Sequence, residues 1–187
     1  MTILGEKCNI HLPENVVYWS TTDSHQQRRY LFGELKNIIP ELKCVSLRDR
    51  DMENIDVVGE GLTYKSIFVK KDEDILLLEW RRKNIESYLL CPRAIAEASG
   101  QNIKDVQEHF NKNFALAIDE KGFVEEKPNE TIILIDGKKI FTQNDTGLEY
   151  IFNVNKYDVA KHMNSDEVCD DIKTFITRTC DFFSTNE

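Results

Sequence analysis

Two carboxylates, one residue apart at the end of an apolar run, are the groups in this sequence best suited to metal chemistry. Asp49 and Asp51 follow the run KCVSL at residues 43–47, a pattern that predicts a short β-strand. Alternate positions of an extended chain project to the same side, so the two carboxylates could share one hard cation. A solvated turn is the alternative in a chain with 33 acidic residues. A D-x-D pair is also found in enzymes that transfer sugars or handle phosphate.

A second apolar run also ends in charge. The run DILLLEW at residues 74–80 leads directly into Arg81, Arg82 and Lys83. The carboxyl ends of parallel strands meet at one edge of an open sheet, where sites are commonly assembled. Arg81 and Arg82 could therefore contact the phosphates of a nucleic acid, with a solvated strand end as the alternative.

Strands and helices alternate along the chain, which predicts an α/β fold. Trp19 ends an apolar run and is expected in the core, and Pro40 ends the first long helix. We expect strands at 15–19, 43–47, 74–80 and 131–135, a further edge strand at 66–69, and helices at 25–39, 85–90, 94–99, 102–118 and throughout the C-terminal third.

Length and composition predict one ordinary globular domain. The chain has 187 residues, of which 41% are hydrophobic, and no Gly/Pro/Ser linker divides it. We expect one domain over 1–187, with a core at about 15–140 and a helical C-terminal extension at about 145–184. No apolar run reaches the roughly 20 residues that span a bilayer, and no leader pattern is present, so we expect a cytoplasmic protein without a membrane partner.

The charge limits how the chain could bind nucleic acid. Its formal net charge is −9, which argues against binding by broad neutralisation of phosphates. Divalent metal ions, a local basic patch or a separate partner would have to supply positive charge.

Three segments in a fixed order resemble a known family. They are CVSLRDRD, then LLLEWRRKNIESYLLCP, then a predicted strand followed by DGKK. Together they resemble the Toprim domain of the OLD (overcoming lysogenization defect) family of ATPase-associated nucleases, over roughly residues 16–183 and most specifically at SLRDRD and NIESYL. The resemblance implies a Toprim-like (Rossmann-like), mainly parallel sheet flanked by helices, with a helical C-terminal part.

The resemblance also implies a role for each matching residue. Asp49, Asp51 and Asp23 would be ligands of Mg²⁺ or Mn²⁺. Glu86 would be a further acidic catalytic group, and Lys138 would contact the phosphate in the transition state. The activity implied is hydrolysis of phosphodiester bonds in DNA or RNA, with DNA favoured over RNA, in a setting such as phage defence. From the residues alone, Glu86 could equally be an acid at a helix N-terminus, and Lys138 a solvated turn lysine.

One departure from the family pattern puts the activity in doubt. A Toprim site normally begins with a glutamate in an E-G-x-x-D arrangement. With Asp23 at the aspartate position, Trp19 stands where the glutamate should be and Ser20 where the glycine should be. Glu6 could be a displaced equivalent of the missing group.

A second departure concerns ATP. The sequence contains no G-x-x-x-x-G-K-[ST] loop, so this chain lacks that kind of ATP site. The resemblance implies an ATPase domain or subunit as a partner, and a homodimer is also compatible. Two hypotheses follow. The chain is a metal-dependent nuclease, or it is a catalytically degenerate Toprim module that serves as an interaction or regulatory partner of an ATPase.

Overall fold

The structure, a computed structural model, describes residues 1–14, 16–50, 58–63, 74–123 and 130–184. Within these residues the fold is mixed α/β and mostly helical, and the described part contains one two-stranded parallel sheet. Asp51 and the expected edge strand at 66–69 lie outside the described residues.

The elements are α1 (Thr2–Lys7), α2 (His25–Ile38), β1 (Cys44–Arg48), η2 (Glu60–Leu62), β2 (Ile75–Glu79), η3 (Ile85–Tyr88), α3 (Pro92–Ser99), α4 (Ile103–Phe114), α5 (Glu130–Leu134), α6 (Gly137–Thr142), α7 (Leu148–Ile151), α8 (Lys156–His162), η4 (Ser165–Glu167) and α9 (Asp170–Ser184).

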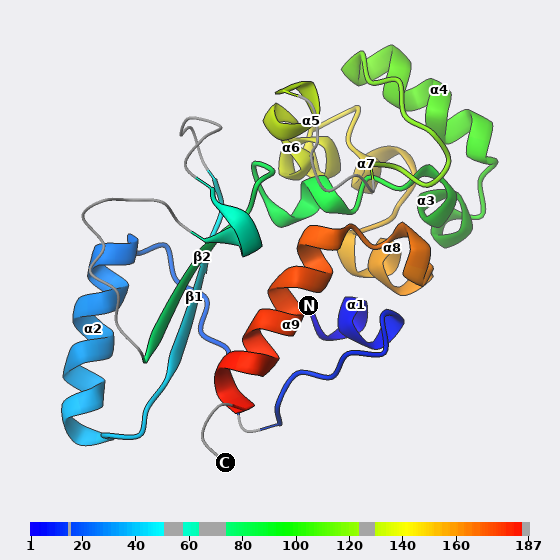
Figure 1. Ribbon diagram of the computed structural model, residues 1–187. Coiled ribbons are helices and arrows are strands. Elements are labelled where there is room, and N and C mark those ends of the chain that lie inside the picture. The colour runs from blue at the N-terminus through cyan, green and yellow to red at the C-terminus, as the bar shows by residue number, and fades with distance from the viewer. Residues whose placement is uncertain (15, 51–57, 64–73, 124–129, 185–187) are drawn as a thin grey trace.

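The two strands confirm the predictions made from the apolar runs at 43–47 and 74–80. They pair in parallel, with Cys44 opposite Ile75 and Arg48 opposite Glu79. Helix α2 lies beside the sheet on one side and α9 on the other (Figure 1). The coarse α/β prediction is therefore correct, whereas a Toprim-like sheet order stays a prediction.

Helix α2 covers one face of the sheet. It begins at a capping box in which Ser24 and Gln27 satisfy each other's backbone N–H groups, as the polar run before the helix allows. Phe32 on this helix is buried against Ile75 and Leu77 of β2. These two strand residues are separated by one position, so their side chains point to the same face.

The opposite face of β2 contributes to the main core. Leu78 and Trp80 are buried there together with residues of α9. The Trp80 ring lies 5.1 Å from the ring centroid of Tyr88 and 5.3 Å from that of Phe175, in both cases tilted. Such tilted aromatic contacts add to the energy of apolar burial, so α9 and η3 are both fixed against the end of β2.

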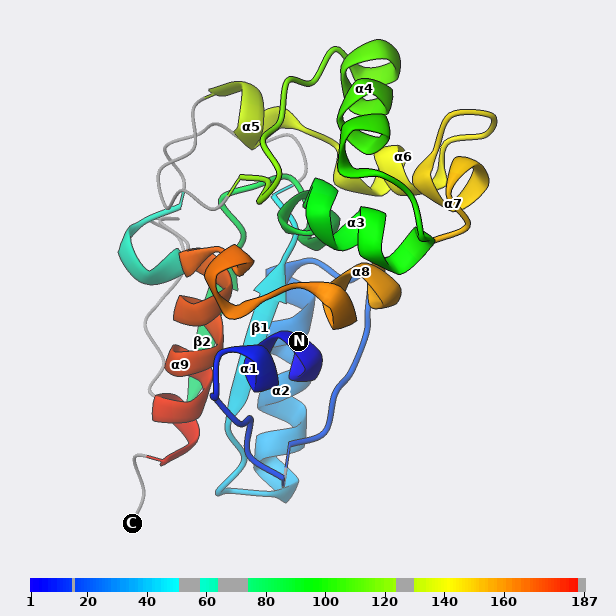
Figure 2. The same ribbon diagram turned by 90° about the vertical axis from the view of Figure 1, so that its right-hand side faces the viewer.

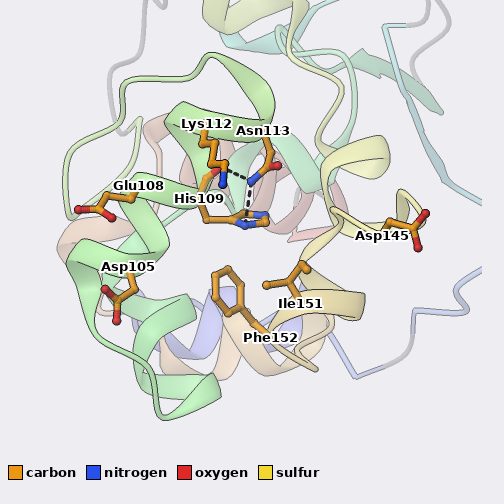
Figure 3. A pocket seen from close by; sticks show the side chains of 8 residues that line it. All are labelled: Asp105, Glu108, His109, Lys112, Asn113, Asp145, Ile151 and Phe152. Carbon is orange, nitrogen blue, oxygen red and sulfur yellow. Dashed lines mark hydrogen bonds between the residues drawn. The ribbon is translucent and has the colours of Figure 1, made fainter.

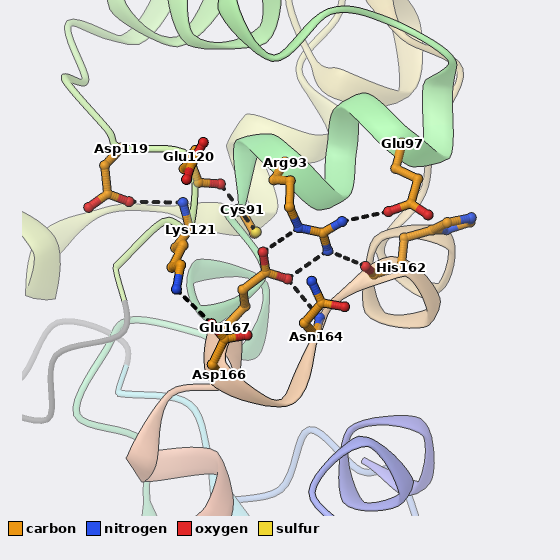
Figure 4. Close-up of polar contacts among 10 residues, drawn as sticks. All are labelled: Cys91, Arg93, Glu97, Asp119, Glu120, Lys121, His162, Asn164, Asp166 and Glu167. Carbon is orange, nitrogen blue, oxygen red and sulfur yellow. Dashed lines mark hydrogen bonds and ion pairs between the residues drawn. The ribbon is translucent and has the colours of Figure 1, made fainter.

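The helices after η3 form a second layer, in which α3 and α8 lie side by side (Figure 2). Their junction is a network of ion pairs and hydrogen bonds (Figure 4). The Arg93 guanidinium of α3 pairs with Glu167 and Glu97 and donates to the carbonyl of His162. Glu167, which is 2% exposed, also accepts from the backbone N–H of Asn164 at 2.7 Å. A buried carboxylate is thus fully supplied with donors.

The strand expected at 131–135 is wrong, because residues Glu130–Leu134 form the short helix α5. A short apolar run rich in β-branched residues cannot be assigned from its periodicity alone. Here Ile132 and Ile133 are buried, and the carbonyl of Ile133 accepts a hydrogen bond from the Arg50 side chain at 3.2 Å. Tertiary contacts therefore override the β propensity of the run.

The strand expected at 15–19 is also wrong for its described part, since residues 16–19 adopt no regular structure. Val17, Tyr18 and Trp19 are 91%, 65% and 63% exposed. The expectation that Trp19 belongs to the core is therefore wrong. Apolar residues favour a strand only when a sheet neighbour buries them, and the structure gives these three no such neighbour among the described residues.

The two tryptophans should respond very differently to truncation. Trp80→Ala leaves a cavity between η3 and α9 and should lower the free energy of unfolding by about 3–5 kcal/mol. Trp19→Ala should change it by less than about 0.5 kcal/mol, because the side chain is mostly solvated. Urea unfolding followed by far-UV circular dichroism measures both, and equal effects would contradict the placement of Trp19.

Candidate functional site

The carboxyl ends of β1 and β2 form one continuous edge. The backbone N–H of Trp80 donates to the carbonyl of Arg48 at 3.1 Å, and that of Arg50 donates to the carbonyl of Lys83 at 3.0 Å. Asp49 lies between these bonds and is exposed. The ladder of the sheet thus continues past the strands and presents the Asp49 side chain at the edge predicted for the site.

Glu86 reaches the same region from η3, where it meets a lysine from α8. Its buried carboxylate pairs with the Lys156 ammonium at 2.8 Å. The pKa of Lys156 is raised, first by this hydrogen bond and further by the negative charges of Glu86 and Asp49, against an opposing effect of burial. A positive charge therefore already interacts with both predicted acidic site residues.

Helix α6 packs closely against η3 at a glycine. A Cβ on Gly137 would come within 2.2 Å of the backbone nitrogen of Ser87, so only glycine permits this approach. The Ser87 hydroxyl donates to the carbonyl of Ile135 at 2.7 Å and accepts from the N–H of Gly137 at 3.1 Å. The Asp136-Gly137 pair is thus the start of a helix packed against the site.

Asp136 caps α6 and binds the end of β2. Its carboxylate accepts from Lys83 at 2.6 Å, from Asn84 at 3.0 Å and from the N–H of Lys139 at 3.1 Å. Burial alone would raise its pKa, but these hydrogen bonds and the charge of Lys83 lower it overall. Lys138 follows in the same helix turn and is exposed. The structure therefore brings the Lys138 segment to the strand edge, and within the described residues its ammonium makes no ion pair.

The Asp23 segment is tied to the end of β1 by an arginine. Arg28 of α2 donates to the carbonyl of Asp23 at 2.8 Å and to that of Leu47 at 2.7 Å. The Asp23 carboxylate itself accepts from the Thr21 hydroxyl at 2.6 Å. Asp23 is therefore near β1, although its carboxylate is engaged within its own loop.

The two arginines after β2 face inward. Arg82 is 1% exposed, its guanidinium lies 4.5 Å from the Tyr88 ring centroid, and it donates to the carbonyls of Ser87 and Phe123. Arg81 pairs with the buried carboxylate of Asp171. A phosphate contact at Arg82 would have to disrupt this buried packing, and one at Arg81 would have to break its ion pair with Asp171.

The oxygen ligands at the strand edge are of the kind that a hard divalent cation prefers, but there are few of them. Asp49 and Glu86 offer carboxylate oxygens, and Mg²⁺ accepts one or two carboxylates with water in the remaining positions. Within the described part of the chain, no group of three or more His, Cys, Asp or Glu side chains could hold a metal ion. The described residues could therefore bind a divalent cation only weakly, with water as most of its ligands. Such a cation would compete with Lys156 for the Glu86 carboxylate.

Sequence reasoning missed three residues that shape this edge. Lys156 and Arg28 lie far along the chain from the groups they contact, and neither stands in a pattern that indicates such a role. Asp136 was visible as half of a turn pair, yet its ion pair with Lys83 depends on how α6 packs. The capping pattern Asp136-Gly137 before an apolar pair was the one available signal.

Comparison of the chain with protein-family models, with curated proteins and with solved structures found no match. No helix within the described ranges is both long and apolar enough to cross a membrane.

Removing the Lys83 ammonium should raise the pKa of Asp136. A lowered pKa means that the ion pair stabilises the fold above the ordinary pKa of aspartate and ceases to do so as the pH falls through the lowered value. Carboxyl NMR titration of Lys83→Met tests this, with Lys138→Met as the matched control, because the Asp136 carboxylate is bonded to Lys83, Asn84 and the Lys139 N–H and not to the Lys138 ammonium. Equal pKa values in both variants would contradict the pairing.

Proposed function

We propose that the chain is a Toprim-like phosphodiesterase that depends on Mg²⁺ or Mn²⁺ and cuts nucleic acid, DNA rather than RNA. The observation that carries the proposal is the parallel pairing of β1 with β2, which brings Asp49 to the edge where η3 supplies Glu86. In open α/β sheets this edge is the usual place for a ligand site. The order SLRDRD, NIESYL and DGKK along the chain agrees with this arrangement.

Each residue has a defined task in this proposal. Asp49 and Glu86 bind the cation through oxygen atoms, and Asp51, which lies outside the described residues, adds a ligand from the same segment. The bound metal would activate water and neutralise charge on the phosphate. Lys138 holds a phosphate oxygen, and its exposed position at the start of α6 leaves it accessible to a substrate. Asp23 remains a proposed ligand that must first leave Thr21.

Lys156 controls the charge of the site. Its ammonium is bonded to Glu86 at 2.8 Å, so a divalent ion that takes this carboxylate must displace it. The Lys156 side chain is 39% exposed and can turn toward solvent at a modest cost, since partly exposed ion pairs contribute little stability. Once displaced, the ammonium would lie close enough to pair with a substrate phosphate.

The acidic charge of the chain supports a partner. A protein with net charge −9 gains little from long-range attraction to nucleic acid. We propose that an ABC-type ATPase domain or subunit supplies the affinity for nucleic acid, as the family resemblance implies. Phage defence is one setting in which such a complex would act. A homodimer would also bring a second strand edge to the same duplex.

A catalytically degenerate Toprim module is the second candidate function, and two observations favour it. Lys156 already balances the charge of Glu86, as expected of a site that no longer holds metal. Trp19, at the position of the missing glutamate, is 63% exposed, which suits a contact with another protein. Such a module would bind its ATPase partner and cut nothing.

Nicking of supercoiled plasmid in the presence of Mn²⁺ distinguishes the candidates. The unaltered chain should nick the plasmid, and Asp49→Asn should reduce nicking to the level without metal, because the amide removes the charge that holds the cation. Glu41→Gln is the matched control, since Glu41 is an exposed acid in the turn that precedes β1, at the other end of the strand from Asp49. It should leave the nicking rate unchanged.

The other outcomes are equally informative. Mn²⁺ binding that depends on Asp49 without any nicking would support the degenerate module. Nicking that survives Asp49→Asn at full rate would contradict the proposed site altogether.

A further inference from the structure

A hollow of about 480 Å³ lies between the end of α4 and helix α6. Its volume falls in the range of about 300–1,000 Å³ that small-molecule sites occupy. The hollow borders the strand edge, because Asp136 lines it and also binds Lys83 and Asn84 at the end of β2. It is therefore a separate space that shares one wall with the candidate site.

The rim of the hollow carries two lysines. Lys112 comes from the last turn of α4 and Lys139 from α6, and both are exposed. Neither ammonium has an ion-pair partner within the part of the chain that the structure describes. The carboxylate of Asp136 does not cancel them, because it is already paired with Lys83 at 2.6 Å. The rim is thus locally positive in a chain whose net charge is −9.

The remainder of the lining is apolar with two amides. Leu116 and Ile140 are buried and Phe114 is partly exposed, so they provide an apolar surface. Gln143 provides an amide that can both donate and accept hydrogen bonds, and Asn113 provides an amide oxygen, since its NH₂ donates to the carbonyl of His109. A ligand that suits this lining has an anionic end for the lysines and a flat, apolar-faced group with polar edges.

A second hollow adjoins the first along α4, and Lys112 and Asn113 line both (Figure 3). Asp105, Glu108 and Asp145 also line the second hollow, and His109 is held there by Asn113 and by the carbonyl of Thr146 at 2.8 Å. Three carboxylates outweigh the single lysine there, so the second hollow does not suit an anion. Glu108 stands one helical turn before Lys112 and therefore opposes anion binding at the first hollow.

We infer that the hollow between α4 and α6 binds a nucleotide, with its phosphate between Lys112 and Lys139 and its base against Phe114. The choice of a nucleotide over other anions rests on the proposed function, since the hollow adjoins the edge where a nucleic acid would be cut. The nucleotide is either a free monophosphate or the end of a DNA strand. Both present one phosphate and one base to the same lining.

Calorimetric titration of the full chain with deoxyadenosine monophosphate, in EDTA, tests this inference independently of any metal or nicking. The Lys112→Ala/Lys139→Ala variant should bind the nucleotide at least about tenfold more weakly, as expected for loss of two charged contacts. Lys104→Ala/Lys161→Ala removes the same charge from exposed positions of α4 and α8 and should bind as the unaltered chain does. Glu108→Gln should bind more tightly.

Three results would overturn the inference: no binding of the monophosphate, equal weakening in both double variants, or equal affinity for inorganic phosphate. A 5′-phosphorylated deoxyadenosine tetranucleotide, titrated in parallel, identifies the source of the ligand. Tighter binding of the tetranucleotide than of the monophosphate would support a DNA end, and the reverse would support a free nucleotide. A chain that binds the nucleotide in EDTA but never nicks DNA would contradict the proposed activity and leave this inference standing.

Discussion

The parallel register of β1 and β2 determines where the groups of the candidate site lie. It is set by two apolar faces: Ile75 and Leu77 pack toward α2, while Leu78 and Trp80 pack toward α9. A slip of one residue would exchange these faces, so that neither set of side chains would match the helix that covers it. Because the register is fixed, the backbone bonds beyond the strands align their carboxyl ends. The position of Asp49 beside the η3 segment follows from that alignment.

Basic side chains from distant segments then bind the carboxylate and carbonyl oxygens at this edge. Lys156 meets Glu86, Lys83 meets Asp136, and Arg28 holds the carbonyls of Asp23 and Leu47. Each cation pairs with a carboxylate or carbonyl oxygen at the edge. These electrostatic contacts order the strand edge, and a divalent cation that binds Glu86 there would have to exchange with Lys156.

Local patterns predicted the parts of the fold that local chemistry determines. The runs at 43–47 and 74–80 are strands, α3 begins at Pro92 and is closed by Gly100 in the left-handed region, and α4 begins after Asn102. The strand predictions for 15–19 and 131–135 were wrong because the conformation of these runs depends on which neighbours bury them. The roles of Lys156 and Arg28 could not be predicted from the sequence for the same reason. Each of their contacts joins segments that only the complete fold brings together.

We propose that Lys156 occupies a cation site formed by Asp49 and Glu86. The affinity for Mn²⁺, measured by calorimetry for the unaltered chain, Lys156→Met and Lys161→Met, tests this proposal. Lys161 lies on the same helix and is exposed, so its loss changes the net charge equally. Lys156→Met should bind Mn²⁺ about tenfold more tightly than Lys161→Met, because the competing ammonium is gone. Equal affinities in the two variants would contradict it.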